Sequence, residues 1–116
     1  MKKFLAIYLG SPSMRSDWEK LDEATRKQRE ASGMKAWGAW MEEYKAAIVV
    51  PGGPLGKTKR AAKQGITDTK NGMVGYVVIQ AESHDAAARL FVNHPHFTIF
   101  PGDSVEIMEV LPIPGQ

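Results

Sequence analysis

The densest group of side chains that could do chemistry lies in the short segment His94–Phe97 (His-Pro-His-Phe), which is followed by Asp103. An imidazole changes protonation near neutral pH, and a carboxylate that orients it makes it a workable general base. His94 lies four residues after Leu90, so on one helix both side chains would face the interior. We expect His94 to act as acid or base and Asp103 to orient it. The alternative is a structural histidine at a helix end, bonded to free carbonyls or a backbone group.

His96 raises the question of a metal site. A His-x-His pair with a nearby carboxylate can hold a divalent ion when a strand presents both rings to one side. Pro95 disfavours that geometry, and no third ligand has a recognisable spacing. The chain also has no cysteine, which removes thiolate ligands and thiol nucleophiles. We therefore predict no metal and no cofactor, place His96 among the ligand contacts, and expect His84 on the surface.

Aromatic side chains could form a pocket next to these histidines. Trp37 and Trp40 lie in a stretch with apolar residues at helical spacing, where such side chains usually belong to the core. Their ring N–H groups still need hydrogen-bond partners, so the alternative is that they lie at the edge of a cleft. We expect Trp37, Trp40, Tyr8 and Pro54 to contact a small molecule together with His96.

A basic segment follows the turn at residues 51–54. Gly52-x-x-x-Gly56-Lys57-Thr58 has one residue too few between its glycines for a phosphate-binding loop, and no packed helix is predicted after it. Its cations could gather around an anionic ligand or could protect an exposed hairpin from edge-to-edge pairing. We favour the second interpretation, with the hairpin tip at Gln64-Gly65. The cations are Lys57, Lys59, Arg60, Lys63 and Lys70.

Composition limits the class of protein. A chain of 116 residues fits one domain, which we assign to residues 1–116 with a peripheral tail at 112–116. The net charge of +2, with both signs interspersed, favours neither nucleic acid nor membrane as a partner. The apolar run at 4–9 is better read as a strand than as a signal peptide. Together with the lack of cysteine, this predicts a cytoplasmic protein.

Hydrophobic patterns and turn residues predict an α+β domain of order β-α-β-β-α-β, the ferredoxin-like arrangement. A Ser16-x-x-Glu19 capping box predicts a helix start near Asp17, and Ser32-Gly33 should interrupt that helix. The expected strands are 4–9, 48–50, 73–79 and 105–111, and the expected helices are 17–31, 34–48 and 84–94.

Two of these strands, 4–9 and 73–79, are apolar at both alternating positions. That pattern is typical of strands covered on both faces. The ferredoxin-like order makes them the central pair, yet its helices cover one face of the sheet. A second sheet must then cover the other face. We therefore predict a homodimer in which two sheets pair into a dimeric α/β barrel.

Several motifs together resemble the YCII-related family over nearly the whole chain. They are strand 4–9, the turn Gly52-Gly53-Pro54-Leu55, Thr67-Asp68, Gly75-Tyr76 on a buried strand, the helix from Ser83 to Pro95 and the closing strand Val105-Glu106-Ile107. The resemblance implies a dimeric α/β barrel, with a His–Asp pair in a cleft as the proposed active site. This chain departs from the pattern, because no histidine precedes His84 and His94-Pro95 stands where the family has Asp-Pro. The Asp-Gly-Pro-Phe run of one branch is likewise replaced, by Asp68-Thr69-Lys70-Asn71.

Two functions follow as expectations. The resemblance implies a small-molecule enzyme of the proton-transfer kind, such as a lyase, an isomerase or a dehalogenase-like protein. The alternative is a non-catalytic dimer that binds or senses a metabolite and uses its histidines structurally. In both cases the partner is an unidentified small molecule, and the sequence does not say which.

Overall fold

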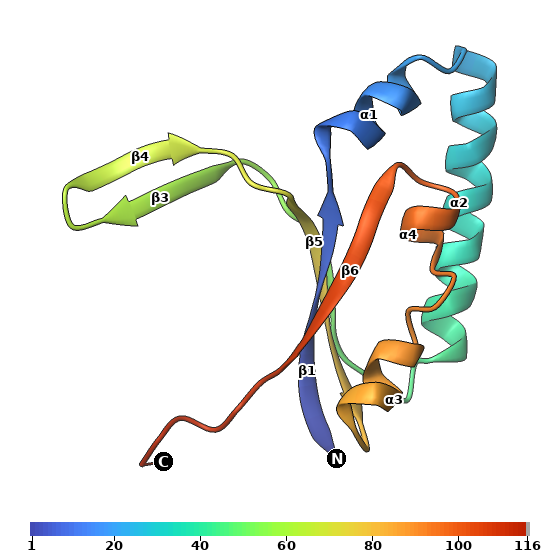
Figure 1. Cartoon of the computed structure of the whole chain (residues 1–116). Coiled ribbons are helices and arrows are strands. Elements are labelled where there is room, and N and C mark those ends of the chain that lie inside the picture. Colours follow the sequence, from blue (N-terminus) through green and yellow to red (C-terminus); the bar gives the residue numbers. More distant parts are fainter. Residues whose placement is uncertain (116) are drawn as a thin grey trace.

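A computed structural model describes residues 1–115 and shows an α+β fold, with helices packed on one face of an antiparallel sheet (Figure 1). The elements in chain order are β1 (Lys2–Gly10), α1 (Pro12–Glu19), α2 (Glu23–Glu43), β2 (Ile48–Pro54), β3 (Thr58–Ala62), β4 (Gly65–Thr69), β5 (Met73–Ala81), α3 (His84–Arg89), α4 (Pro95–Thr98) and β6 (Gly102–Glu109). Setting aside the β3–β4 hairpin, the order is the expected β-α-β-β-α-β with each helical part divided in two.

The four-stranded sheet has the order β2-β5-β1-β6, so β1 and β5 are its central strands. This confirms the prediction from their apolar residues at both parities. β1 is antiparallel to both neighbours, and Tyr8 stands opposite Gly75 on β5 and Val105 on β6. The last strand begins at Gly102, earlier than the expected residue 105, because Gly10 and Gly102 still pair after a register shift.

The two faces of the sheet differ in how well they are covered. Alternate residues of β1 and β5 that face the helices are buried, and Phe4, Ile79 and Val77 are among the largest fully buried side chains. The opposite parity forms the open face, where none of the helices packs (Figure 1). Its residues, half-buried or exposed, include Leu5, Ile7, Leu9, Val50, Val74, Tyr76, Val78, Glu106 and Met108. Burial on both faces is thus incomplete within one chain.

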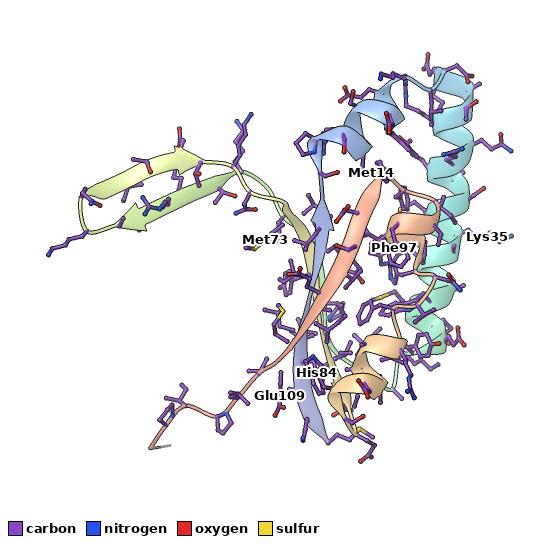
Figure 2. The ribbon with its side chains drawn as sticks, in the orientation of Figure 1. Met14, Lys35, Met73, His84, Phe97 and Glu109 are labelled. Atoms are coloured by element: carbon purple, nitrogen blue, oxygen red, sulfur yellow. The ribbon has the colours of Figure 1, made fainter. Side chains whose placement is uncertain are left out.

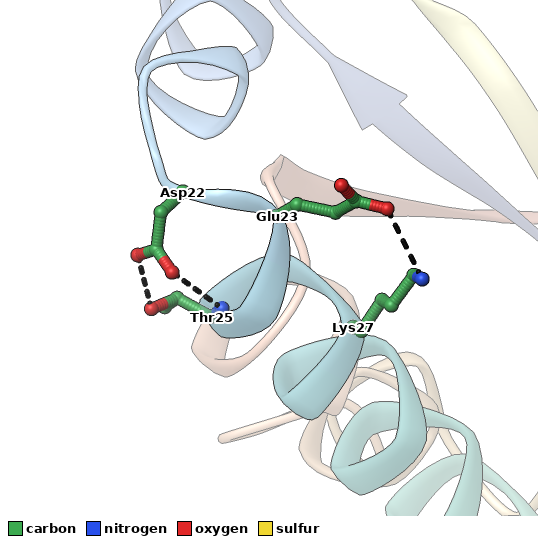
Figure 3. Close-up of polar contacts among 4 residues, drawn as sticks. All are labelled: Asp22, Glu23, Thr25 and Lys27. Carbon is green, nitrogen blue, oxygen red and sulfur yellow. Dashed lines mark hydrogen bonds and ion pairs between the residues drawn. The ribbon is translucent and has the colours of Figure 1, made fainter.

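The first helical region breaks at a different place from the one expected. α1 begins at Pro12, with Ser11 as its N-cap accepting the N–H of Met14 at 3.3 Å. The predicted capping box at Ser16 does not start a helix, because proline at the first helical position already favours an earlier start. α2 begins after Asp22, whose carboxylate accepts the N–H of Thr25 at 3.2 Å (Figure 3).

α2 runs without interruption through Gly33, contrary to the expected break at Ser32-Gly33. Gly33 is buried, and a Cβ placed there would overlap the ring of Phe100. The glycine therefore provides close approach between the helix and an aromatic ring, at a modest cost in helix propensity. Trp37, Trp40 and Met41 face the core as predicted, but Met34 is 66% exposed.

The second helical region is also shorter than expected. Ser83 caps α3 as predicted, through its hydroxyl and the N–H of Ala86 at 3.1 Å, but α3 ends at Arg89. Asn93 then adopts a positive φ of 58°, and a separate short helix, α4, begins at Pro95. Pro95 therefore starts a helix rather than ending one, as its missing N–H allows at a first helical position.

β3 and β4 form a hairpin that we call the arm (residues 57–70). Its strands pair from Thr58 with Thr69 to Ala62 with Gly65, so the two-residue turn is Lys63-Gln64, one residue before the predicted tip. The two strands are largely exposed, as predicted. The arm projects from the sheet on the side opposite the helices (Figure 1). It helps to give a radius of gyration of 16.2 Å, against about 13 Å for a compact chain of this length.

Candidate functional site

Three polar side chains meet between the sheet and α2. His94 is fully buried, His96 is 6% exposed and Tyr8 is 4% exposed. The Tyr8 hydroxyl lies 3.4 Å from His94 Nε2, and His94 Nδ1 accepts the backbone N–H of His96 at 3.0 Å. We call Tyr8, His94 and His96 the histidine cluster. It joins the first strand of the chain to the start of α4.

These contacts define the protonation of His94. Because Nδ1 accepts a hydrogen bond, it carries no proton, so a neutral ring holds its proton on Nε2. Nε2 then donates to the Tyr8 oxygen, which leaves the Tyr8 O–H proton directed elsewhere. His94 also serves as the N-cap of α4, and its side chain binds the N–H of His96 there. The residue thus has a local structural role in addition to its contact with Tyr8.

His96 is held by the backbone of β1. Its Nε2 lies 2.7 Å from the carbonyl oxygen of Leu9, so Nε2 donates and a neutral ring keeps its lone pair on Nδ1. Gly102 makes room for this ring, because a Cβ at that position would overlap both Cε1 and Nε2 of His96. The pairing of β1 with the start of β6 therefore sets the position of His96.

Burial in an apolar environment controls the ionisation of the histidine cluster. Desolvation lowers the pKa of His94 to about 4, and repulsion from His96 acts in the same direction. Desolvation also lowers the pKa of His96, although hydrogen bonds to the backbone of Leu9 and Ser104 and the charge of Asp103 oppose it. Burial raises the pKa of Tyr8 well above its usual value. All three groups are therefore neutral at pH 7.

Aromatic rings enclose the cluster. The Trp37 and Trp40 rings meet the His94 ring edge-on, with centroids 4.6 Å and 4.7 Å away, and Phe91 stacks at 5.8 Å. Trp40 Nε1 donates to the carbonyl of Leu90 at 2.8 Å, so its polar atom has a partner inside the protein. The structure thus brings Tyr8, Trp37 and Trp40 together with the histidines, as the sequence predicted for a common site.

Asp103 and Pro54 lie elsewhere. Asp103 is exposed and accepts the hydroxyl of Ser104 at 3.0 Å, while both ring nitrogens of His94 are bonded to Tyr8 and the His96 backbone. Its charge acts on His96 instead. Pro54 is exposed at the end of edge strand β2, opposite Gly75. His84 is exposed as expected, but it also bonds the carbonyl of Ile107 at 2.7 Å and stacks on Phe4.

A recess of about 220 Å³ lies between α1, α2 and the segment after α4, and none of the three cluster residues lines it. Phe100 forms part of its wall and also contacts Trp37, with ring centroids 6.0 Å apart. Trp37 in turn contacts both histidines. Phe97, which extends between the sheet and α2, lies on the same wall (Figure 2). The full lining is Met14, Asp17, Trp18, Leu21, Arg29, Phe97, Thr98, Ile99, Phe100 and Pro101.

Sequence reasoning missed the recess, the contact between Tyr8 and His94, and the part played by Phe100. Tyr8 and His94 are far apart along the chain, so no local spacing could connect them. A signal did exist for Phe100, because a glycine within an otherwise continuous helical pattern often marks a close packing contact. Gly33 marks that contact here.

Within residues 1–115, no group of three or more His, Cys, Asp or Glu side chains is placed to bind a metal ion. No helix in that part of the chain is long and apolar enough to cross a membrane.

Comparisons with known proteins give a limited result. No family model matches the sequence, and no curated protein matches it. Among solved structures, the chain is similar to 5-chloro-2-hydroxyhydroquinone dehydrochlorinase from Burkholderia phenoliruptrix AC1100, in complex with 2,5-dihydroxybenzoquinone. The identity is 23%, the match covers 91% of this chain and 90% of the other, and the TM-score is 0.49.

Proposed function

We propose that this protein is a small-molecule enzyme of the proton-transfer type that uses the histidine cluster as its polar machinery. One observation carries the proposal, the hydrogen-bonded chain from Tyr8 through His94 to His96 inside an aromatic wall. Burying polar groups in such surroundings costs free energy, whereas burying apolar side chains at the same positions would not. Ionisable groups with displaced pKa values are concentrated at functional sites.

The neutral state of the cluster suits the binding of a substrate oxygen that gains negative charge. Tyr8 keeps its proton and donates it in a hydrogen bond, while His94 Nε2–H supports the Tyr8 oxygen. Neutral imidazole can stabilise such charge without being an acid itself. His96 is our candidate for the base, because its Nδ1 lone pair can accept the proton that leaves the substrate.

Access to the cluster would come from the recess beside α1. Phe100 and Trp37 separate the recess from the two histidines. Arg29 and Asp17 line the recess, and most of its other lining residues are apolar. This combination suits a small aromatic molecule with polar substituents. Movement of both the Phe100 ring and the Trp37 ring would connect the recess with His96. We therefore expect Phe100→Ala to change substrate binding more than folding.

Deuterium exchange tests proton transfer across a panel of candidate compounds. Small ketones and hydroxyquinones, including 2,5-dihydroxybenzoquinone, would be incubated with the protein in D2O, and carbon-bound deuterium would be measured by mass spectrometry. Protein-dependent exchange should fall at least about tenfold in His96→Gln, which removes the proposed base, and in Tyr8→Phe. His84→Gln is the matched control and should retain the wild-type rate. Exchange that survives in both cluster variants would refute the proposal.

A non-catalytic binding dimer is the second candidate, and a specific observation favours it. Both ring nitrogens of His94 are already bonded to protein groups, as expected for a residue that only caps α4. NMR of the imidazole and indole protons distinguishes the two candidates. Shifts of the Trp37 and His96 signals on adding 2,5-dihydroxybenzoquinone, without deuterium exchange into any compound tested, would favour binding alone.

We further infer that the working unit is a homodimer joined through the open faces of two sheets. On this face, Val74 of the central strand β5 is 36% exposed, and Val50 and Met108 of the edge strands β2 and β6 are each 41% exposed. They lie beside half-buried apolar residues of β1 and β5. A contiguous apolar patch of this kind marks an interaction site. The motifs that resemble the YCII-related family support both membership in that family and this pairing.

Analytical ultracentrifugation between about 1 and 100 μM tests the dimer. Ile7→Lys places a charge at the centre of the open face and should produce a folded monomer. Lys35→Glu, on the outer side of α2, should leave the dimer intact (Figure 2). A wild-type protein that stays monomeric throughout this range would refute this part of the proposal.

A further inference from the structure

The arm lacks the contacts that would stabilise it within its own chain. Its substantial contacts, within residues 1–115, are those between β3 and β4. An isolated two-stranded hairpin is at best marginally stable in water. The arm has one cross-strand ion pair, Lys59 to Asp68 at 2.7 Å, and one larger apolar side chain, Ile66, which is 73% exposed. A partner that covers the arm would supply what it lacks.

Charge separates the arm from the rest of the protein. Residues 57–70 hold five of the chain's 15 Lys and Arg residues but one of its 13 Asp and Glu residues. The remainder therefore carries ten cations and twelve anions, so the arm is strongly basic while the body is mildly acidic. No aromatic residue occurs on the arm to stack a nucleobase, which favours a protein surface over nucleic acid. The body of a second copy has the required opposite charge.

The direction of the arm also points to a second copy. The arm leaves the sheet on the open side (Figure 1), at the level of Met73, which pairs with Leu9. Each strand of the arm is about 17 Å long, whereas facing sheets lie about 10 Å apart. The arm is therefore long enough to reach past a partner's sheet that covers the open face.

Symmetry decides which part of the partner the arm reaches. A two-fold axis parallel to the strands, running between facing sheets, places the β2 edge of one copy over the β6 edge of the other. This axis also keeps the arms of both copies at the same end of the strands. Leu9, level with Met73 at the arm's base, also pairs with Ser104 on β6. The partner's arm then passes beside Asp103 and Glu106, which are both exposed. A two-fold axis perpendicular to the strands would instead place the partner's arm at the other end of the strands, away from Asp103.

From these observations we propose that the arm clasps a second copy of this chain, with its basic residues against the acidic residues at the start of β6. The contact is reciprocal, because a two-fold axis gives each copy one arm and one acidic site. It rests on the homodimer of the proposed function and adds a second contact at the β6 edge of the open face, where Glu106 lies. Ile66 near the tip supplies the apolar part, and Arg60 and Lys63 supply the charge.

Charge reversal with rescue tests the clasp. The variant Arg60→Glu with Lys63→Glu avoids the Lys59–Asp68 pair, so the arm keeps its internal contact. It should raise the dimer dissociation constant about tenfold or more at 50 mM NaCl, and less at 500 mM. Adding Asp103→Lys and Glu106→Lys to the same chain should restore most of the affinity. Lys20→Glu with Lys35→Glu makes the same charge change, at the end of α1 and on α2, and should have little effect.

Hydrogen exchange of the wild-type protein gives an independent test. At protein concentrations below the dimer dissociation constant, the backbone amides of β3 and β4 should exchange rapidly. At concentrations above it, they should exchange at least about tenfold more slowly. A dimer whose affinity is unchanged by the arm variant, or whose arm amides exchange equally fast at all concentrations, would overturn the clasp alone. A wild-type protein that is monomeric up to about 100 μM would overturn both the clasp and the dimer.

Discussion

The histidine cluster and the arm are opposite solutions to the placement of polar residues. In the cluster, His94 is fully buried and its ring nitrogens are bonded within the protein. In the arm, Lys59 and Asp68 form an ion pair whose side chains are 74% and 85% exposed. Substitutions in the buried cluster should therefore lower the free energy of unfolding, whereas substitutions on the exposed arm should change the stability of a single chain little. The difference is that the polar atoms of the cluster are bonded inside the protein, whereas the polar atoms of the arm are exposed.

The largest expected difference between these regions comes from removing one apolar side chain in each. Phe4→Ala empties a fully buried position and should lower the free energy of unfolding by about 4 kcal/mol. Ile66→Ala removes a side chain that is 73% exposed and should cost less than about 0.5 kcal/mol in the monomer. Urea denaturation at low protein concentration measures both. Equal losses would mean that the arm packs against its own chain.

A pH series tests the burial of His94. Its pKa is about 4 in the folded protein and about 6.5 when unfolded, so between these values the unfolded state binds more protons. Stability is therefore highest above pH 6.5 and falls as the pH drops toward 4, by about 3 kcal/mol from this residue. The free energy of unfolding of His94→Gln should lack this part of the decline. His84→Gln, which retains the buried ring, should decline like the wild type.

Two glycines on α2 provide a smaller and sharper comparison. Gly33→Ala brings a Cβ into the ring of Phe100, whereas a Cβ on Gly38 would meet nothing within 4 Å. Gly38→Ala should raise the free energy of unfolding by up to about 1 kcal/mol through helix propensity. Gly33→Ala should instead lower it by about 1 to 2 kcal/mol and shift the Trp37 signal. A stabilising effect at both positions would show that Phe100 moves away freely.

The smallest effect is expected from the exposed ion pair of the arm. Asp68→Asn removes the partner of Lys59 and should change the free energy of unfolding of the monomer by less than about 1 kcal/mol. Thermal denaturation in low and high salt measures the change. A larger, salt-sensitive loss would indicate that Asp68 contributes to more than this exposed pair.

Much of the fold could be predicted from local patterns. The apolar residues at both parities of β1 and β5 identified the central strands, because that pattern reports burial directly. Ser83 likewise marked the start of α3, and Gln64-Gly65 located the hairpin turn to within one residue. The helix boundaries could not be predicted as well. The role of Gly33 depends on Phe100, a residue far along the chain whose position no local rule supplies.

The site shows the same limit. The burial of His94 was expected from its spacing after Leu90, but α3 ends at Arg89 and His94 caps the next helix. The burial of His94 was therefore predicted correctly, but the reason was wrong, because the helix that contains residues 84–89 does not reach His94. Its partner could not be inferred, because the contact with Tyr8 depends on how β1 packs against the segment before α4. Whether His94 and Asp103 take part in catalysis stays a prediction.

The prolines of β2 have a consequence for assembly. Pro51 and Pro54 lie in this outermost strand, and neither has a backbone N–H to donate to a neighbouring strand. The pairing of β2 with β5 also has two register shifts, so the free edge of β2 does not present a regular series of backbone hydrogen-bonding groups. Such an edge resists the strand-by-strand growth that leads to fibrils. The β2 edge is therefore a poor template for adding strands from other copies of this chain, even at high protein concentration.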